Sequence, residues 1–276
     1  MPVPLQRILL ATEGTDFDAG AERVAIELAA RFAVPLRAVL PLVTNPEFLS
    51  LAPEREEKAE AEAAAKLERL RQAARAGGVE LLGKVRRGEA PFREIVDEAA
   101  ESRAELIVLR RRGKRSYLAN LLLGEMVHTV IGHAPCDVLI VPRAAQLWTT
   151  GILLATDGSP HSRRATAVAA AIAANRHLPL TVVSVADGGR AAAEHCVAEA
   201  LAEAQAAGLR TSGRVIAGDG RKPAEAILAV GEEVGADLIV IGRRGLNRVA
   251  RLLVGSTSER VAGRAGGAVL IVQETA

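Results

Sequence analysis

The stretch ILLATDGS, at residues 152–159, repeats the stretch ILLATEGT, which stands 144 positions earlier at residues 8–15. Two more apolar blocks recur in the same order. ELIVL at 105–109 returns as DLIVI at 237–241, and DVLIV at 137–141 returns as AVLIV at 268–272. This period is far too long for a solenoid repeat, so it indicates a duplicated domain.

The length of the chain also suits two domains, because 276 residues exceed the size of one ordinary domain. We expect a first domain at residues 1–145 and a second at residues 146–276. In both, short β-branched runs alternate with long alanine-rich segments, which is the pattern of βα units around a parallel sheet. The sequence therefore predicts two Rossmann-like α/β domains, each a five-stranded parallel sheet between helices.

The elements of the second domain follow from the positions of these runs. We expect strands near 151–156, 179–186, 210–217, 237–242 and 268–273, and helices near 160–176, 190–207, 222–234 and 256–264. Ser159 is a candidate N-cap, and Pro160 suits the first position of a helix. The first domain has the same layout, with a long charged helix at about 53–76 that we interpret as a solvated helix face.

The composition excludes several classes of protein. The formal net charge is +2 and six residues are aromatic, so neither a cationic groove for nucleic acid nor a base-stacking platform is expected. No apolar run approaches the ~18 residues that span a bilayer, and the amino-terminal residues do not resemble a signal peptide. We expect a cytoplasmic protein with no membrane segment and no nucleic-acid partner.

The cysteines and histidines indicate no metal site. Cys136 and Cys196 are too few for a disulfide framework or a four-cysteine zinc site, so we expect both to be reduced and structural. The five histidines show no spacing typical of metal ligands. Surface or capping roles are therefore expected for them.

A ligand site is expected where the strand order of each sheet reverses. If the five strands are ordered 3-2-1-4-5, this point lies between the first and fourth strands, and ligands bind at their carboxyl ends. In the second domain those ends are residues 156–158 and 242–245.

The segment after the fourth strand carries a glycine pattern. It reads GRRG at 242–245 and, nine residues later, GSTS at 255–258. Glycines let the backbone approach a phosphate without an intervening Cβ, and a helix that starts at Ser256 would attract anions. The alternative is structural, because 256–259 also fits a capping box and the glycines could serve turns alone. Spacing by itself leaves both open.

With the duplication and this spacing, the chain resembles a tandem universal stress protein over about 7–141 and 150–272. The resemblance implies an adenine nucleotide alpha hydrolase-like fold and ATP in the second domain, with Mg²⁺ left open. Asp157 would lie near the ribose, although an Asp-Gly turn before the helix is an alternative. Val185 would contact adenine through its backbone. The implied site comprises Thr156, Asp157, Gly158, Val185, Gly242, Arg243, Gly245, Gly255, Ser256 and Thr257.

The first domain departs from this pattern. The residues at the positions equivalent to Asp157, Val185, Gly242 and Ser256 are Glu13, Pro41, Arg110 and Glu125. In addition, ten residues separate Gly113 from Gly124, where the second domain has nine between its two glycines. Arg110 would fill the space that a phosphate needs, and Glu125 would set negative charge against negative charge. We therefore predict one ATP per chain. A smaller anion at Arg110 to Arg112 stays open.

Three functions fit these observations. We favour an ATP-binding regulatory protein of the stress response, which is not an enzyme. A slow ATP-hydrolysing or phosphate-transferring enzyme is an alternative, although Asp157 is the one evident candidate for its chemistry. A nucleotide-free scaffold or small-molecule carrier is the third. The sequence identifies no protein partner.

The fifth strands suggest how the domains assemble. Both are strongly apolar and would leave an open sheet edge, which invites aggregation unless it is covered. We predict that residues 138–141 and 269–272 face each other across a pseudo-twofold axis, as an internal pseudo-dimer. Further pairing into a homodimer stays open.

Overall fold

The computed structural model describes residues 5–44, 53–111, 123–187, 189–218, 220, 222–245 and 254–274. The first domain contains β1 (Ile8–Ala11), α1 (Ala19–Phe32), β2 (Leu36–Val43), α3 (Pro53–Ala76), β3 (Leu81–Gly88), α4 (Pro91–Glu101), β4 (Leu106–Arg110), α5 (Glu125–His133) and β5 (Asp137–Val141). The second repeats this order as β6 (Ile152–Ala155), α6 (Pro160–Arg176), β7 (Leu180–Ala186), α7 (Arg190–Ala206), β8 (Thr211–Ala217), α8 (Pro223–Glu233), β9 (Leu238–Gly242), α9 (Ser256–Arg264) and β10 (Ala268–Val272). Each element of the second domain lies within one residue of its predicted bounds.

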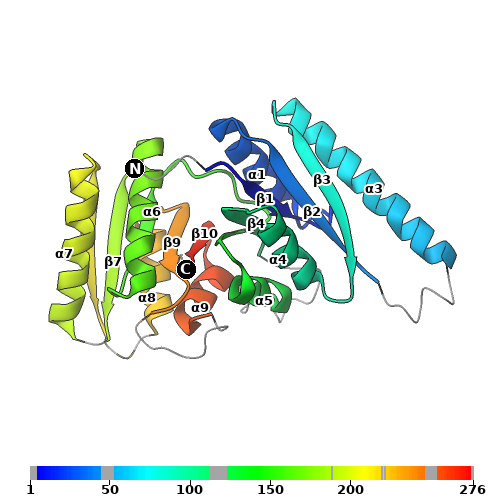
Figure 1. Cartoon of the computed structure of the whole chain (residues 1–276). Coiled ribbons are helices and arrows are strands. Elements are labelled where there is room, and N and C mark those ends of the chain that lie inside the picture. The colour runs from blue at the N-terminus through cyan, green and yellow to red at the C-terminus, as the bar shows by residue number, and fades with distance from the viewer. Residues whose placement is uncertain are drawn as a thin grey trace.

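The two domains share one ten-stranded sheet, with the order β3-β2-β1-β4-β5-β10-β9-β6-β7-β8. Within each domain the strands are parallel and ordered 3-2-1-4-5, as we assumed from the sequence. The fifth strands, β5 and β10, pair antiparallel where the two domains meet (Figure 1). Leu139 lies opposite Leu270. The prediction that they face each other is therefore confirmed, and neither domain leaves this edge exposed.

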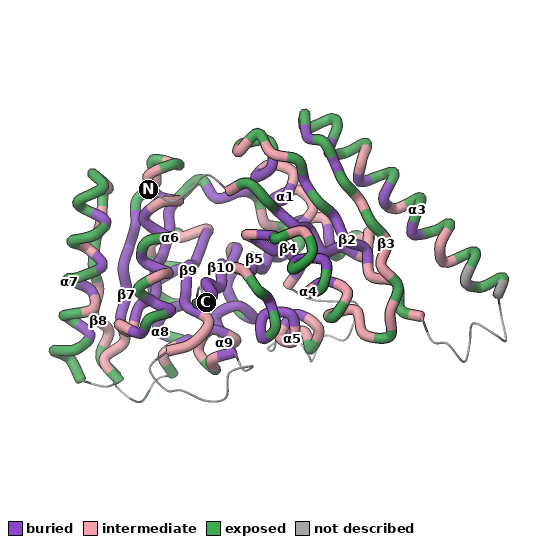
Figure 2. The backbone as a smooth tube through the Cα atoms, in the orientation of Figure 1, coloured by how far each residue is buried: buried purple, intermediate pink, exposed green. Residues whose placement is uncertain are grey.

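A hydrophobic core runs through both domains on each face of the sheet. Leu139 and Leu270 belong to the core under α1, α3, α6 and α7, whereas Ile140 and Val269 belong to the core under α4, α5, α8 and α9. The central strands are consequently buried on both sides (Figure 2), and β5 and β10 are apolar except for Asp137 at the start of β5. None of the helices in the described ranges is both long and apolar enough to cross a membrane.

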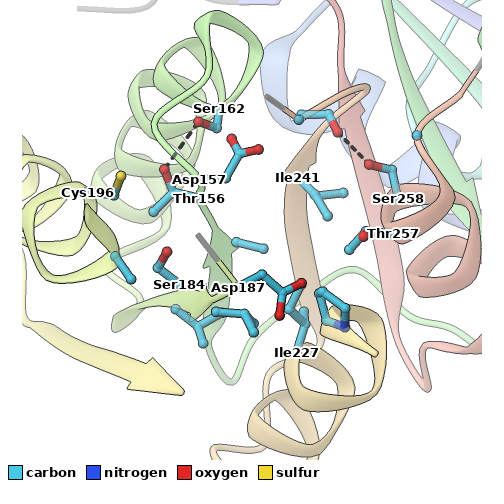
Figure 3. A pocket seen from close by; sticks show the side chains of 18 of the residues that line it. Thr156, Asp157, Ser162, Ser184, Asp187, Cys196, Ile227, Ile241, Thr257 and Ser258 are labelled. Carbon is cyan, nitrogen blue, oxygen red and sulfur yellow. Dashed lines mark hydrogen bonds between the residues drawn. The ribbon is translucent and has the colours of Figure 1, made fainter. Parts of the chain in front are cut away.

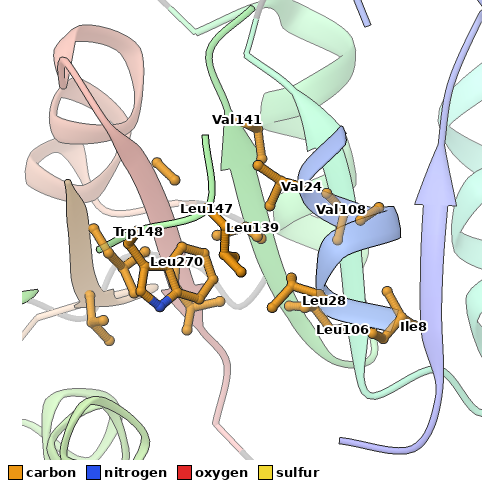
Figure 4. Close-up of a cluster of buried hydrophobic side chains, with 14 of the residues drawn as sticks. Ile8, Val24, Leu28, Leu106, Val108, Leu139, Val141, Leu147, Trp148 and Leu270 are labelled. Atoms are coloured by element: carbon orange, nitrogen blue, oxygen red, sulfur yellow. The ribbon is translucent and has the colours of Figure 1, made fainter. Parts of the chain in front are cut away.

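The linker between the domains packs into the core that contains Leu139 and Leu270. Leu147 and Trp148 are buried and lie beside Leu139 and Leu270 (Figure 4). The carboxylate of Asp237 then accepts hydrogen bonds from three successive backbone N–H groups at residues 149–151, at 2.6, 2.9 and 3.1 Å. These bonds hold the chain at the entry into β6.

Candidate functional site

A pocket of about 460 Å³ lies at the carboxyl ends of β6, β7 and β9, where the strand order of the second domain reverses. The amino-terminal half of α7 and the starts of α8 and α9 complete its walls (Figure 3). Eight of the ten predicted residues line it: Thr156, Asp157, Val185, Gly242, Gly245, Gly255, Ser256 and Thr257. The sequence-based location of the site at this point of the fold thus agrees with the geometry.

The wall that follows β6 combines a tight turn with polar groups. Thr156 Oγ1 donates a hydrogen bond to Ser162 Oγ at 3.3 Å, and Asp157 Oδ1 accepts one from the Ser159 N–H at 3.0 Å. Gly158 has a φ of 76°, a conformation that favours glycine, and it shapes this turn without lining the pocket. The Asp-Gly turn considered as an alternative is therefore present, and the Asp157 carboxylate lines the pocket as well.

The glycines after β9 allow a close approach of two chain segments. A Cβ on Gly242 would lie 2.9 Å from the backbone of α6, and one on Gly245 would lie 2.3 Å from Asp157 Oδ2. Gly255 has more room, since its Cβ would stand 3.2 Å from the carbonyl oxygen of Arg243. Because Gly242 and Gly245 have no side chains, the end of β9 and the loop that follows it can lie directly against β6 and α6.

Helix α9 begins at the pocket. Its N-cap is Gly255, and no side chain caps it, so the capping box considered for 256–259 does not form. Instead, Ser258 Oγ donates to the carbonyl oxygen of Gly242 at 2.7 Å. The N–H groups of the first turn have no intrahelical acceptor, and they belong to residues such as Ser256 and Thr257 that line the pocket. This arrangement suits an anion.

Sequence reasoning missed several lining residues. They are Ala155, Ser162, Val183, Ser184, Asp187, Gly189, Ala192, Ala193, Cys196, Pro223, Ile227, Ile241 and Ser258. Those on α7 carry no motif, and their position follows only from the helix packing beside β7. Val183, Val185 and Ile227 are parts of one apolar cluster, so the pocket has an apolar side as well as its polar one.

Cys136 and Cys196 are both free, as predicted.

Arg243, which belongs to the implied site, is not among the residues that line the pocket. Its Nη1 donates to the carbonyl oxygen of Gly132 in the last turn of α5, at 3.0 Å, and Arg244 lines the pocket instead. The two adjacent arginine side chains therefore have different surroundings, one at the first domain and one at the pocket. Burial and the charge of Arg244 lower the pKa of Arg243.

The histidines fulfil the expected roles only in part. His177 is the C-cap of α6, in agreement with the prediction, whereas the expectation is wrong for His161, which is 6% exposed. Helix α6 packs against β9 here, and His161 Nε2 lies 3.2 Å from Glu274 Oε2. Burial lowers the pKa of His161. Within the described ranges, no group of three or more His, Cys, Asp or Glu side chains could hold a metal ion.

In the first domain, a side chain occupies the corresponding place. Arg110 ends β4 as Gly242 ends β9, and its guanidinium is buried. Its Nη1 donates to Asp18 Oδ2 at 2.9 Å and its Nη2 to Glu13 Oε1 at 2.5 Å. The Arg110 side chain thus occupies the space that is open beside Gly242 in the second domain, as predicted. Glu125 begins α5 where Ser256 begins α9.

The small-anion site considered at Arg110 to Arg112 gains no support from this arrangement, because Arg110 is already bound to two carboxylates. Arg112 and Gly113 lie outside the described residues.

Fold and site together define a tandem of doubly wound α/β domains, with a ligand-sized pocket where the strand order of the second domain reverses. The model of the universal stress protein family matches residues 4–142 and 150–273. The chain therefore belongs to the universal stress protein family and contains two copies of its domain.

Relatives of one and of two domains agree with this assignment. A universal stress protein of Thermus aquaticus is 39% identical over 137 residues, which cover 44% of this chain and 97% of the relative. The crystal structure of a universal stress protein from Archaeoglobus fulgidus has a TM-score of 0.69 at 23% identity, covering 97% of this chain and 96% of its own. A putative universal stress protein from Pseudomonas aeruginosa gives 0.74 at 21% identity, with 98% and 94% covered. At these identities the two structures support the fold alone.

Proposed function

We propose that the second domain binds ATP, one molecule per chain, and that the protein is a cytoplasmic, nucleotide-dependent regulator of the stress response. The observation that carries this proposal is the relation between Asp157 and Gly245 in the pocket. The Asp157 carboxylate and the Gly245 backbone lie side by side there, and the first turn of α9, whose N–H groups have no intrahelical acceptor, lines the same pocket. Both an acceptor for sugar hydroxyls and donors for phosphate oxygens are thus present in one pocket.

The lining residues divide into groups that suit the parts of a nucleotide. Ser256, Thr257 and the first-turn N–H groups of α9 would hold phosphate oxygens, with Arg244 adding positive charge. Val183, Val185 and Ile227 offer apolar surface for the base. A volume of about 460 Å³ lies within the range of small-molecule sites, about 300–1,000 Å³.

We propose binding rather than turnover. Phosphate transfer requires a base at the attacking group and usually carboxylates for Mg²⁺. Among the lining residues that the structure describes, the carboxylates are Asp157 and Asp187, and Asp157 is already bound to the Ser159 N–H. ATP would bring Mg²⁺ on its phosphates, and we assign no side chain to the ion.

Calorimetric titration of the full chain with ATP tests this proposal, together with analysis of nucleotide released on denaturing the purified protein. We expect one site per chain. Two equivalent sites would overturn the stoichiometry, and absence of binding would overturn the function. Multiple turnovers in a phosphate-release assay would favour an enzyme over a regulator.

A further inference from the structure

Arg243 connects the glycine loop of the second domain with the first domain. Its carbonyl oxygen accepts a hydrogen bond from the Gly255 N–H at 2.9 Å, where the chain returns to begin α9. Its own N–H donates to the carbonyl oxygen of Val272, at the end of β10, also at 2.9 Å. Its side chain crosses to the first domain and donates to Gly132 at 3.0 Å. One residue thus joins the pocket, the last strand and the neighbouring domain.

The end of α5 is suited to receive this side chain. The last carbonyl groups of a helix lack intrahelical donors and carry partial negative charge, so a guanidinium is a favourable partner. A second side chain from the second domain also binds there, because Gln273 Nε2 donates to the carbonyl oxygen of Ile131 at 2.9 Å. Two adjacent carbonyl groups in the last turn of α5 are therefore held by residues that follow β9 and β10.

The first domain reciprocates with Arg111. The Arg111 N–H donates to the carbonyl oxygen of Val141 at 3.0 Å, and its Nη1 donates to the carbonyl oxygen of Ala265, the C-cap of α9. Each domain thus supplies an arginine to the carboxyl end of the other domain's last helix. The two arginines differ in their neighbours, since Arg243 precedes pocket residues whereas Arg111 follows the ion-paired Arg110.

We propose that Arg243 is a positioning residue for the phosphate side of the pocket, an inference that rests on the proposed ATP binding. The anchor on α5 fixes the backbone of Arg243, which holds Gly255 and, through it, the first turn of α9. The side chain is half-buried, and among the residues that the structure describes its Nε has no hydrogen-bond partner. Without the anchor, residues 243–245 lose their support from the first domain, and the phosphate donors lose their alignment.

The test compares Arg243→Met with Arg111→Met, because each removes one arginine bond between the domains. Titrations with ATP and with adenosine, together with thermal unfolding, are measured on both full-length variants. We expect Arg243→Met to weaken ATP binding about tenfold, the magnitude of a lost charged hydrogen bond, while adenosine affinity changes less than about twofold. Arg111→Met should leave both affinities within about twofold of the wild type.

Other results would overturn the inference. Unchanged ATP affinity in Arg243→Met would show that the loop needs no anchor. Equal losses in Arg243→Met and Arg111→Met would indicate general adhesion between the domains, and equal losses for ATP and adenosine would exclude a specific effect on the phosphate side. Should Arg243→Met not fold, Arg243→Gln replaces it, with the same loss of ATP affinity expected because the glutamine side chain is uncharged and two bonds too short to reach the Gly132 carbonyl oxygen. A wild-type chain that binds no ATP would instead remove the proposed function itself, and this inference with it.

Discussion

Arg110 Nη1 lies 2.9 Å from Asp18 Oδ2, and the two side chains are 6% and 1% exposed. By the internal repeat, this ion pair stands where the second domain has Gly242 and Ser162. Removing both charges from water is costly, and only their mutual attraction and hydrogen bonds offset that cost. The same place in the fold is therefore an internal ion pair in one domain and part of a pocket wall in the other.

Arg110→Met should strongly destabilise the protein, because it leaves the buried Asp18 carboxylate without its cation. Breaking a buried pair in this way costs about 3–5 kcal/mol in the free energy of unfolding. Urea denaturation measures the loss. Arg190→Met is the matched control, since its pair with Glu194 is 74% and 53% exposed and should contribute less than about 1 kcal/mol. Similar losses in the two variants would contradict a structural role for the buried pair.

Gly255→Val should abolish ATP binding, whereas Gly124→Val should leave it unchanged. The two glycines are equivalent N-caps, with φ and ψ of −63° and 140° at Gly255 and −60° and 141° at Gly124. A Cβ at Gly255 would press on the Arg243 carbonyl oxygen at 3.2 Å, while one at Gly124 would meet nothing closer than 3.9 Å. Calorimetry with ATP compares the variants.

Thermal unfolding of both glycine variants serves as the control for folding. If Gly255→Val folds and retains wild-type ATP affinity, the start of α9 is not the phosphate site. If Gly124→Val loses binding, the first domain takes part in it after all.

The fold was predictable because most strands of the second domain contain a short apolar run between helical segments, and because the first, fourth and fifth strands recur in both halves of the chain. The pairing of the two domains was predictable because their fifth strands are apolar, and an apolar edge strand has to be shielded from solvent. The glycine spacing also located most of the pocket, since glycines without room for a Cβ are required by the backbone itself. Gly242 shows this, because a Cβ there would lie 2.9 Å from the backbone of His161.

What sequence reasoning missed depends on side-chain direction and on contacts between distant segments. Arg243 and Arg244 look equivalent in sequence, yet one binds α5 and the other lines the pocket. Arg110 was identified as an obstacle, but its partner Asp18 was not, because 92 residues separate them and no local pattern joins them. Cys196 was missed for a similar reason, as it reaches the pocket only through the packing of α7.

His161 should make the protein less stable as the pH falls below about 7. Burial, with Arg243 and Arg244 nearby, holds its folded-state pKa below the ordinary value, although Glu274 and Asp157 oppose this shift. The unfolded chain then binds the proton first, at about pH 6.5, so stability is lost as the pH falls toward the folded pKa. The slope is at most about 1.4 kcal/mol per pH unit.

Urea denaturation of His161→Gln at pH 7.5, 6.5 and 5.5 measures this contribution, and the variant should show a shallower dependence on pH than the wild type. His195→Gln is the control, because His195 is 72% exposed and should leave the dependence unchanged. Parallel pH profiles for wild type and His161→Gln would contradict the assignment.

Bound ATP should protect Cys196 from alkylation. Cys196 lines the pocket, and burial together with the Asp157 carboxylate raises the pKa of its thiol, so iodoacetamide should react slowly at pH 7 and faster at pH 9. At ATP about ten times the dissociation constant, the rate should fall about tenfold, because only the free protein reacts. Mass spectrometry distinguishes this from Cys136, whose pKa is raised to about 12 and which should stay unmodified. In Gly255→Val, ATP should give no protection. A wild-type Cys196 that reacts equally fast with and without saturating ATP would place the nucleotide outside this pocket.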